Sequence, residues 1–159
     1  MHFKYLLLLM ITSLTLSGCI QPISADLLEN PSPNQNRDSA SHDLKLSVTE
    51  ASYDRSVDNI KYTIDNSSES LLEYGEFFYL EKKVNGEWYM LAFEDKIFSD
   101  FYSFTNFGHF IKPEGERVHS IDPGKYNLTI DSGEYRLSKA FRYEEEDSRF
   151  WLADEFTVE

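Results

Sequence analysis

The sequence predicts an all-β protein: an antiparallel sandwich of about seven strands, preceded by an export signal and a tether. Short runs in which apolar and polar residues alternate are separated by turn signals, and aromatic and β-branched residues are frequent. No segment of useful length shows the 3.6-residue period of an amphipathic helix. We therefore expect two packed sheets rather than a helical domain.

The N-terminus predicts a signal peptide over residues 1–18. Lys4 supplies a positive charge, and an apolar run of eleven residues follows from Leu6 to Leu16. This run is well short of the ~20 residues that a membrane-spanning helix needs. A basic start followed by a short apolar stretch is typical of an export signal that is removed on maturation.

The end of this segment, Leu16-Ser17-Gly18-Cys19, resembles the lipobox of bacterial lipoproteins. The resemblance implies that the Cys19 sulfur receives a diacylglyceryl group and that the peptide bond before Cys19 is then cut. Two acyl chains give a stable anchor, because each buried methylene contributes about 0.8 kcal/mol. We therefore expect a lipoprotein on the extracytoplasmic face of the cell membrane. The alternative is an ordinary signal peptide with an incidental cysteine.

Composition limits the possible partners and bonds. The formal charge of −13 argues against binding nucleic acid or acidic lipid head groups. Cys19 is the one cysteine of the chain, so no intramolecular disulfide can form. Residues 19–43, rich in Pro, Ser and Asn, predict a lipidated cysteine followed by a flexible tether.

From residue 44 to 159 the pattern predicts one sandwich domain. Leu44, Leu46 and Val48 alternate with polar residues, and Asn85-Gly86 between two aromatic-rich runs is a strong hairpin signal, since both residues tolerate positive φ. Strands are expected at residues 44–48, 60–64, 76–84, 87–93, 117–121, 134–143 and 150–158.

A tyrosine corner is expected near the second-last strand. Residues 130–135, Ile-Asp-Ser-Gly-Glu-Tyr, have the apolar-x-x-Gly-x-Tyr arrangement of Greek-key sandwiches, in which the Tyr hydroxyl reaches back to the backbone. Residues 121–126 fit the same pattern. We prefer Gly133 and Tyr135, because a regular strand follows them directly.

An ordered set of short pieces resembles a family of bacterial immunoglobulin-like domains found on exported lipoproteins of low-GC Gram-positive bacteria. The resemblance covers about residues 44–158. It implies an immunoglobulin-like Greek-key sandwich and an extracytoplasmic setting, and it implies no reaction. The inter-sheet disulfide of antibody domains is absent, and Trp88 is not assigned the buried-Trp role. The pieces are Ile64–Ser68, Tyr74–Glu76, Leu80–Lys82, Asn85–Tyr89, Gly133–Arg136 and Ala153–Phe156.

The sequence offers no catalytic site, and we expect no metal or cofactor. No Gly-x-Ser-x-Gly elbow is present, and Cys19 is used by the lipid. His109 and His119, with Glu114 or Glu116, could ligate a metal, but their spacing favours loop histidines. The acidic run 144–147 is interpreted as a solvated loop, with weak cation binding as the alternative.

Residues 93–110 carry seven aromatic side chains and are the best candidate for a binding surface. The rings either close the core or form an exposed patch, and exposed apolar patches mark interaction sites. The residues proposed for binding are Phe98, Phe101, Tyr102, Phe104 and Phe107.

We therefore expect a non-catalytic, membrane-anchored module that recognises a protein or a cell-wall component through the loop 94–115. The alternative is an accessory subunit that modulates a neighbouring membrane enzyme or sensor. A modulator should co-purify with a membrane protein, whereas a wall binder should sediment with cell walls. An enzyme in its own right is the third possibility, and it would need a convergent polar pocket.

Overall fold

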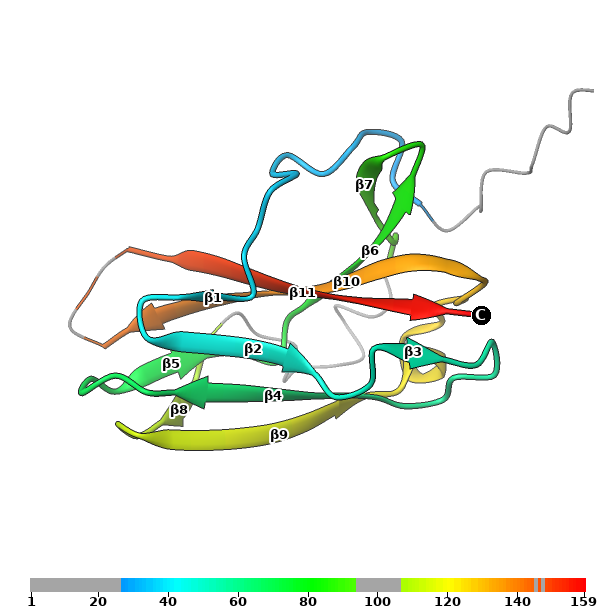
Figure 1. Cartoon of the computed structure of the whole chain (residues 1–159). Coiled ribbons are helices and arrows are strands. Elements are labelled where there is room, and N and C mark those ends of the chain that lie inside the picture. The colour runs from blue at the N-terminus through cyan, green and yellow to red at the C-terminus, as the bar shows by residue number, and fades with distance from the viewer. Residues whose placement is uncertain (1–26, 94–106, 145, 147) are drawn as a thin grey trace, which may run out of the picture.

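The computed structural model describes residues 27–93, 107–144, 146 and 148–159. Two sheets pack face to face as a sandwich, with the long strands β10 and β11 in one layer and β2, β4 and β9 in the other (Figure 1). The all-β class and the sandwich expected from the sequence are confirmed. Among the described residues, no helix is long and apolar enough to cross a membrane.

The first sheet has four strands in the order β1-β2-β4-β9, and its neighbouring strands pair antiparallel. Its centre is the pair β2–β4, in which Leu46 lies opposite Ile64. The strands are β1 (Ala40–Ser41), β2 (Leu44–Val48), β4 (Ile60–Asn66) and β9 (Gly115–Ile121).

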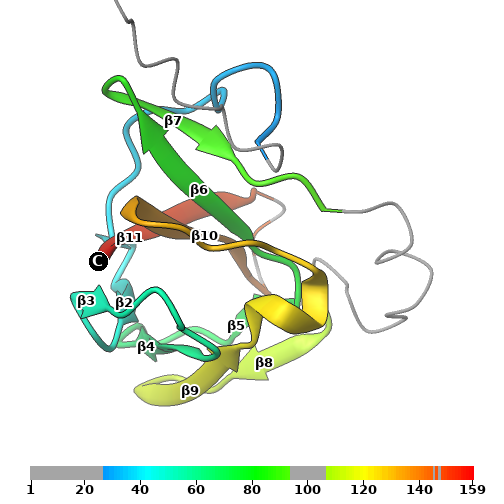
Figure 2. The same ribbon diagram turned by 90° about the vertical axis from the view of Figure 1, so that its right-hand side faces the viewer.

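The second sheet is built around β10. This strand pairs with β11 along its length on one side, while β5 and β6 follow one another along its other side. A hairpin joins β6 to β7, and it projects from the sandwich (Figure 2). The strands are β3 (Ser52–Tyr53), β5 (Leu72–Tyr74), β6 (Tyr79–Val84), β7 (Glu87–Met90), β8 (His109–Ile111), β10 (Gly133–Tyr143) and β11 (Phe150–Val158).

The core lies between the sheets and follows the alternation of the strands. Leu44, Leu46, Ile60 and Ile64 point inward from the first sheet and are at most 1% exposed. Leucine and aromatic residues of β10 and β11, together with Phe78 and Tyr126, complete the cluster. The period of two that predicted these strands is therefore the period of burial.

The seven expected strands are present, and the structure adds four short ones: β1, β3, β5 and β8. The strand expected from residue 76 begins at Tyr79 instead. The carbonyls of Gly75 and Phe77 leave the sheet there and accept hydrogen bonds from Lys139 Nζ at 2.9 and 3.0 Å. An interior lysine thus takes the place of strand pairing at the break between β5 and β6. After β9 the chain forms a 3-10 helix, η1 (Pro123–Tyr126), which is capped by Asp122.

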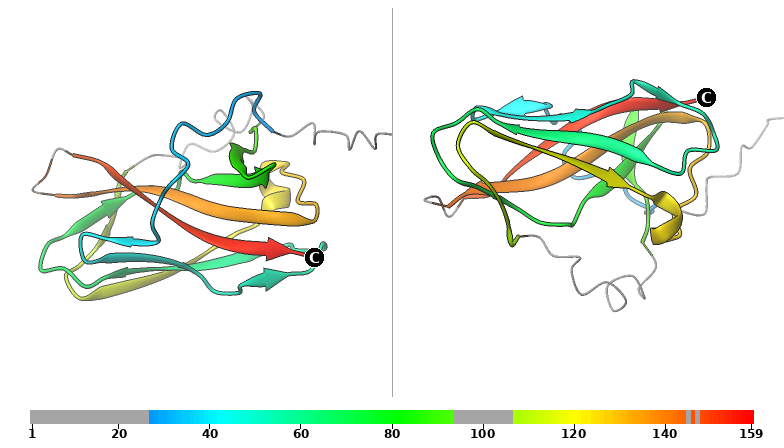
Figure 3. Two further views of the ribbon diagram at one scale, coloured as in Figure 1. Left: turned by 45° about the horizontal axis from the view of Figure 1, so that its top comes forward. Right: turned by 90° about the horizontal axis from the view of Figure 1, so that it is seen from below.

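The segment before β2 differs from the flexible tether expected over residues 19–43. Residues 27–41, here called the strap, run along β7 and then across the second sheet to β2 (Figure 3). The Leu28 N–H donates to Met90 O, and the Ala153 N–H donates to Asp38 O, both at 2.9 Å. Composition misled here because the strap is held by hydrogen bonds to the sandwich, which a polar segment can make as well as an apolar one.

Candidate functional site

The strap covers a pair of opposite charges on the outer face of the second sheet. Side chains alternate along β10, so Arg136 points away from the core while its neighbours Tyr135 and Leu137 point inward. Across the ladder, Arg136 lies directly opposite Glu81 of β6. The two side chains are only 1% and 0% exposed, because the strap lies over them.

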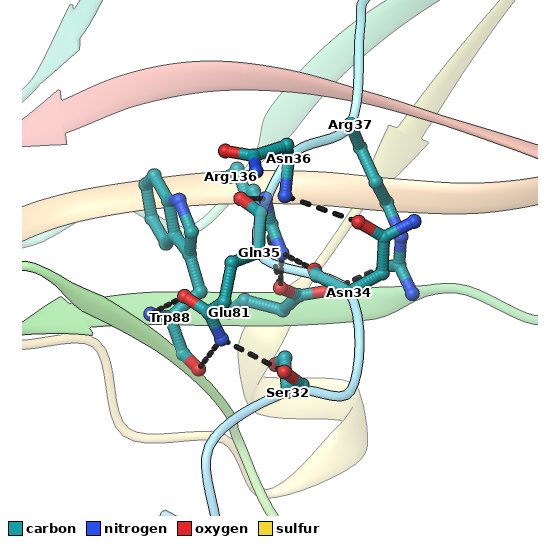
Figure 4. A network of polar contacts seen from close by, with 8 residues as sticks. All are labelled: Ser32, Asn34, Gln35, Asn36, Arg37, Glu81, Trp88 and Arg136. Atoms are coloured by element: carbon teal, nitrogen blue, oxygen red, sulfur yellow. Dashed lines mark hydrogen bonds and ion pairs between the residues drawn. The ribbon is translucent and has the colours of Figure 1, made fainter.

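Arg136 links the sheet to the strap (Figure 4). Its Nε donates to Glu81 Oε2 at 2.6 Å, and Nη2 also contacts that carboxylate. The same guanidinium donates to the backbone carbonyls of Asn34 at 2.7 Å and Gln35 at 2.9 Å. One side chain therefore neutralises a buried carboxylate and holds two peptide groups of the strap, using the fork geometry of arginine.

A second arginine reaches Glu81 from the strap itself. Arg37 Nη1 donates to Glu81 Oε1 at 2.6 Å, so the carboxylate binds one arginine from each side. The Arg37 guanidinium also lies 4.9 Å from the ring centroid of Trp151. Burial lowers the pKa of Arg37, and the charge of Glu81 opposes that change. We call Arg37, Glu81 and Arg136 the clamp.

The Gln35 side chain completes the attachment, because its amide group hydrogen-bonds to the backbone of β7 as a neighbouring strand would. Its Oε1 accepts from the Trp88 N–H at 2.7 Å, and its Nε2 donates to the carbonyls of Trp88 and Ser32 at 3.1 and 2.8 Å. Trp88 is 4% exposed, and its ring centroid lies 4.7 Å from the Arg136 guanidinium. Trp88 is thus buried, but beneath the strap rather than between the two sheets.

A polar hollow of about 340 Å³ adjoins the clamp. Lys83, Asp38 and Glu155 are among its walls, so both signs of charge are present. The guanidinium of Arg136 is already occupied by Glu81 and the strap. The chemistry of this site is therefore attachment: it fixes the N-terminal segment to the sandwich.

The Tyr135 hydroxyl makes the contact expected of a tyrosine corner. It donates to Asp131 O at 2.9 Å and lies 2.6 Å from Asp131 Oδ1. Gly133 has a φ of +156°, and Lys82 Nζ lies 2.5 Å from Asp131 Oδ1. Burial raises the pKa of Asp131, but the hydrogen bonds from Lys82 and Tyr135 outweigh it and hold this pKa below its ordinary value.

The ends of the aromatic segment lie in two different environments. Phe98, Phe101, Tyr102 and Phe104 lie outside the described residues, as do the signal peptide and the Leu16–Cys19 motif. The Phe93 ring packs against Phe78 and Tyr126 at the edge of the core. The Phe107 ring lies 4.5 Å from the Arg142 guanidinium and 5.5 Å from that of Arg149. Phe110 is 47% exposed.

The two histidines lie on strands β8 and β9 rather than in loops, and they meet around Tyr74. His119 Nε2 lies 2.9 Å from the Tyr74 hydroxyl, and the His109 ring lies 5.5 Å from the Tyr74 ring. His109 contacts Glu76 at 2.9 Å. Within the described part of the chain, no three His, Cys, Asp or Glu side chains gather in a way that could hold a metal. Glu144 and Glu146 of the acidic run are exposed.

Lys139 is the unexpected member of the core. Its Nζ lies near the faces of Tyr62 and Tyr74, at 5.6 and 5.9 Å from the ring centroids. Burial lowers its pKa to about 7, while the charge of Glu76 opposes that change. Burial of His119, together with the nearby Lys139, also lowers the pKa of the imidazole.

Sequence reasoning missed the clamp and the interior lysine. Strand alternation could have placed Arg136 on the face opposite Tyr135, and it could have placed Lys139 on the same face as Leu137 and Phe141. Nothing in the sequence pattern indicates that Gln35 and Arg37, far away in the chain, cover that outer face.

The described geometry defines a class: a two-sheet sandwich, antiparallel except where β3 pairs parallel with β11, with a tyrosine corner and an N-terminal strap. A family model described as "Bacterial Ig-like domain" matches residues 40–157. The chain therefore belongs to the bacterial immunoglobulin-like domain family, as the sequence motifs suggested. The match begins at β1, so most of the strap precedes it.

The chain shows only weak similarity to solved structures. The ASH/PapD-like domain of human CEP192 is 13% identical, with a TM-score of 0.40, over 86% of this chain and 95% of that one. The alkylpurine DNA glycosylase AlkC of Pseudomonas fluorescens is 10% identical, with a TM-score of 0.34, over 73% of this chain and 30% of that one. A β-glucosidase of Erythrobacter marinus is 9% identical, with a TM-score of 0.33, over 73% and 15%. No curated protein matches.

Membership of the immunoglobulin-like family suggests an interaction domain rather than an enzyme. Fold alone does not define a partner, and the three structural likenesses are too weak to suggest one.

Proposed function

We propose that this protein is a lipid-anchored, extracytoplasmic recognition module: a lipoprotein whose immunoglobulin-like domain binds a protein or cell-wall component without catalysis. One observation carries the proposal. The strap that follows the Leu16–Cys19 motif is clamped to the sandwich from Leu27 onward, so an anchor at Cys19 would hold the whole domain. A connection of this kind would leave only residues 20–26 between the anchor and the first attached residue of the domain.

The anchor can be tested directly. We expect the full-length chain to incorporate labelled palmitate and to partition into the detergent phase, and we expect Cys19→Ser to lose both properties. Ser17→Ala, which keeps a small residue before the cysteine, is the matched control and should retain both. A wild-type chain that takes up no lipid would refute the lipoprotein assignment.

The recognition surface is proposed at the aromatic segment, with Phe98, Phe101, Tyr102, Phe104 and Phe107. The exposed Phe110 supports this location, because aromatic residues, Phe among them, are enriched in protein interfaces. The triple variant Phe101→Ser, Tyr102→Ser, Phe104→Ser should lose a partner that the wild type recovers from solubilised membranes or purified cell wall. Val118→Ser, on β9, is the matched control for loss of an exposed apolar residue.

The fraction that yields the partner distinguishes the two roles. Recovery from cell wall indicates a wall-binding module, and recovery of a membrane protein indicates an accessory subunit. A triple variant that stays folded and keeps its partner would move the recognition surface elsewhere.

A further inference from the structure

The start of the strap forms an apolar surface together with the β6–β7 hairpin. A hollow of about 310 Å³ is lined by Leu27, Leu28, Val84 and Tyr89, together with the polar residues Glu29 and Asn85. Leu28 is 46% exposed, one of three large apolar residues so exposed among those described. We call Leu28, Val84 and Tyr89 the hairpin patch.

The covalent chain limits how far this patch can lie from the anchor. Leu27 follows Cys19 by eight positions, and a fully extended chain spans at most ~3.5 Å per position, or about 28 Å. Without the contacts that residues 27–39 make, the first fixed residue would be Ala40 in β1, which could lie about 70 Å away. The contacts of the strap therefore shorten the free segment between Cys19 and the domain.

The attachment also selects which side of the domain faces the anchor. The strap joins the sandwich beside β7, where the Leu28 N–H bonds to Met90 O and the Ser32 N–H bonds to Trp88 O. The β6–β7 hairpin lies at the opposite side of the sandwich from β9 (Figures 1 and 2). An anchor at Cys19 would therefore connect to the sandwich on the side that carries the hairpin patch, away from β9.

We propose that the hairpin patch docks on the outer surface of the lipid bilayer, with Leu28, Val84 and Tyr89 in the interfacial region. This inference rests on the proposed lipid anchor. The chemistry suits that environment, because tyrosine combines an apolar ring with a polar end and is enriched at membrane interfaces. Glu29 and Glu87 flank the patch, so the contact is apolar rather than an attraction to acidic head groups, and raised salt should not weaken it.

The test uses the full-length lipidated protein in lipid nanodiscs. Because Cys19 is the one cysteine of the chain and its sulfur carries the lipid, a nitroxide label reacts only at an introduced cysteine. Glu87→Cys places the label beside the patch, and Val118→Cys places it on β9; both native residues are exposed. A nickel chelate on the lipid head groups should relax the label at residue 87 and leave the label at residue 118 unaffected.

Leu28→Ser with Tyr89→Ser should abolish the relaxation at residue 87 while the protein stays in the nanodisc. Val118→Ser in the same Glu87→Cys background is the matched control and should change nothing. Equal relaxation at residues 87 and 118 in a retained protein would overturn the docking surface and leave the anchor standing. Dipolar coupling between labels at residue 87 would assign the patch to a second copy and overturn the lipid assignment. A protein that is neither lipidated nor retained would refute the anchor and, with it, this inference.

Discussion

Arg136 and Glu81 oppose each other in register on β10 and β6, and the strap covers both side chains. Arg37 of the strap binds the second oxygen of the same carboxylate. Two arginines thus share one buried carboxylate, and the carbonyls of Asn34 and Gln35 accept two further hydrogen bonds from Arg136. The clamp makes the N-terminal segment part of the domain.

The clamp predicts that removing the buried carboxylate of Glu81 costs much more stability than removing an exposed carboxylate. Glu81→Ala should lower the free energy of unfolding by about 3–5 kcal/mol, because it leaves two buried guanidinium groups without their counter-ion. Urea denaturation followed by tryptophan fluorescence measures this change. Glu134→Ala removes an exposed partner of Lys83 and should change stability little. Equal losses in the two variants would contradict the clamp.

Lys139 predicts stability that rises with pH above neutrality. Its folded pKa, about 7, is below its unfolded value, so between about pH 7 and 10.5 the unfolded chain holds the additional proton. Stability therefore increases over that range, by at most about 1.4 kcal/mol per pH unit. Urea denaturation from pH 6 to 9.5 measures the slope, and the Lys139 ¹³Cε shift in the folded protein should titrate near neutral pH.

At high pH, ionisation of a buried tyrosine limits the rise in stability that Lys139 causes. Burial raises the pKa of Tyr62, so the stability that its neutral hydroxyl contributes is lost as pH rises beyond its unfolded value near 10. Lys139→Met should flatten the slope between pH 7 and 10, whereas Lys45→Met, on an exposed position of β2, should keep it. A Lys139 carbon that titrates near pH 10.5 would refute the neutral buried amine.

The tyrosine corner predicts that removing the Tyr135 hydroxyl lowers the stability of the domain. Tyr135→Phe should lower the free energy of unfolding by about 1–2 kcal/mol, because it leaves the Asp131 carbonyl without its donor. Thermal and urea unfolding provide the measurement. Tyr89→Phe removes a partly exposed hydroxyl that lies 3.5 Å from Glu87, and it should be nearly neutral. A neutral Tyr135→Phe would show that the hydrogen bond does not stabilise the corner.

In the β6–β7 turn, we expect substitution of Gly86 to lower stability through backbone strain and not through a steric clash. Gly86 has a φ of +88°, and a Cβ built there would meet nothing within 4 Å. Gly86→Ala should therefore cost about 1 kcal/mol through the left-handed backbone alone. Gly86→Asn should cost less, because asparagine tolerates this region better. If both variants match the wild type in urea denaturation, the turn has a different conformation in solution.

The strands and their inward faces could be predicted because their information is local. Leu44, Leu46 and Ile64 alternate with polar residues, and a period of two is sufficient to assign a strand and its buried side. The Asn85-Gly86 turn was equally predictable, since both residues adopt positive φ. The short strands β3 and β8 escaped prediction because long-range pairing with Thr157 and Glu73 defines them, rather than any pattern of their own.

Local pattern thus determines the sandwich, its core faces, its hairpin and its tyrosine corner, and it supplies the Leu16–Cys19 motif on which the proposed anchor depends. The strap, the clamp and the interior Lys139 depend on residues brought together from distant parts of the chain. By composition, Gln35 and Arg37 belong to a tether. Their contacts with Arg136 and Glu81 form only because folding places these two residues on the outer faces of β10 and β6. A polar residue carries no local sign of its partner, because its hydrogen bonds depend on geometry that exists only after the sheets have formed.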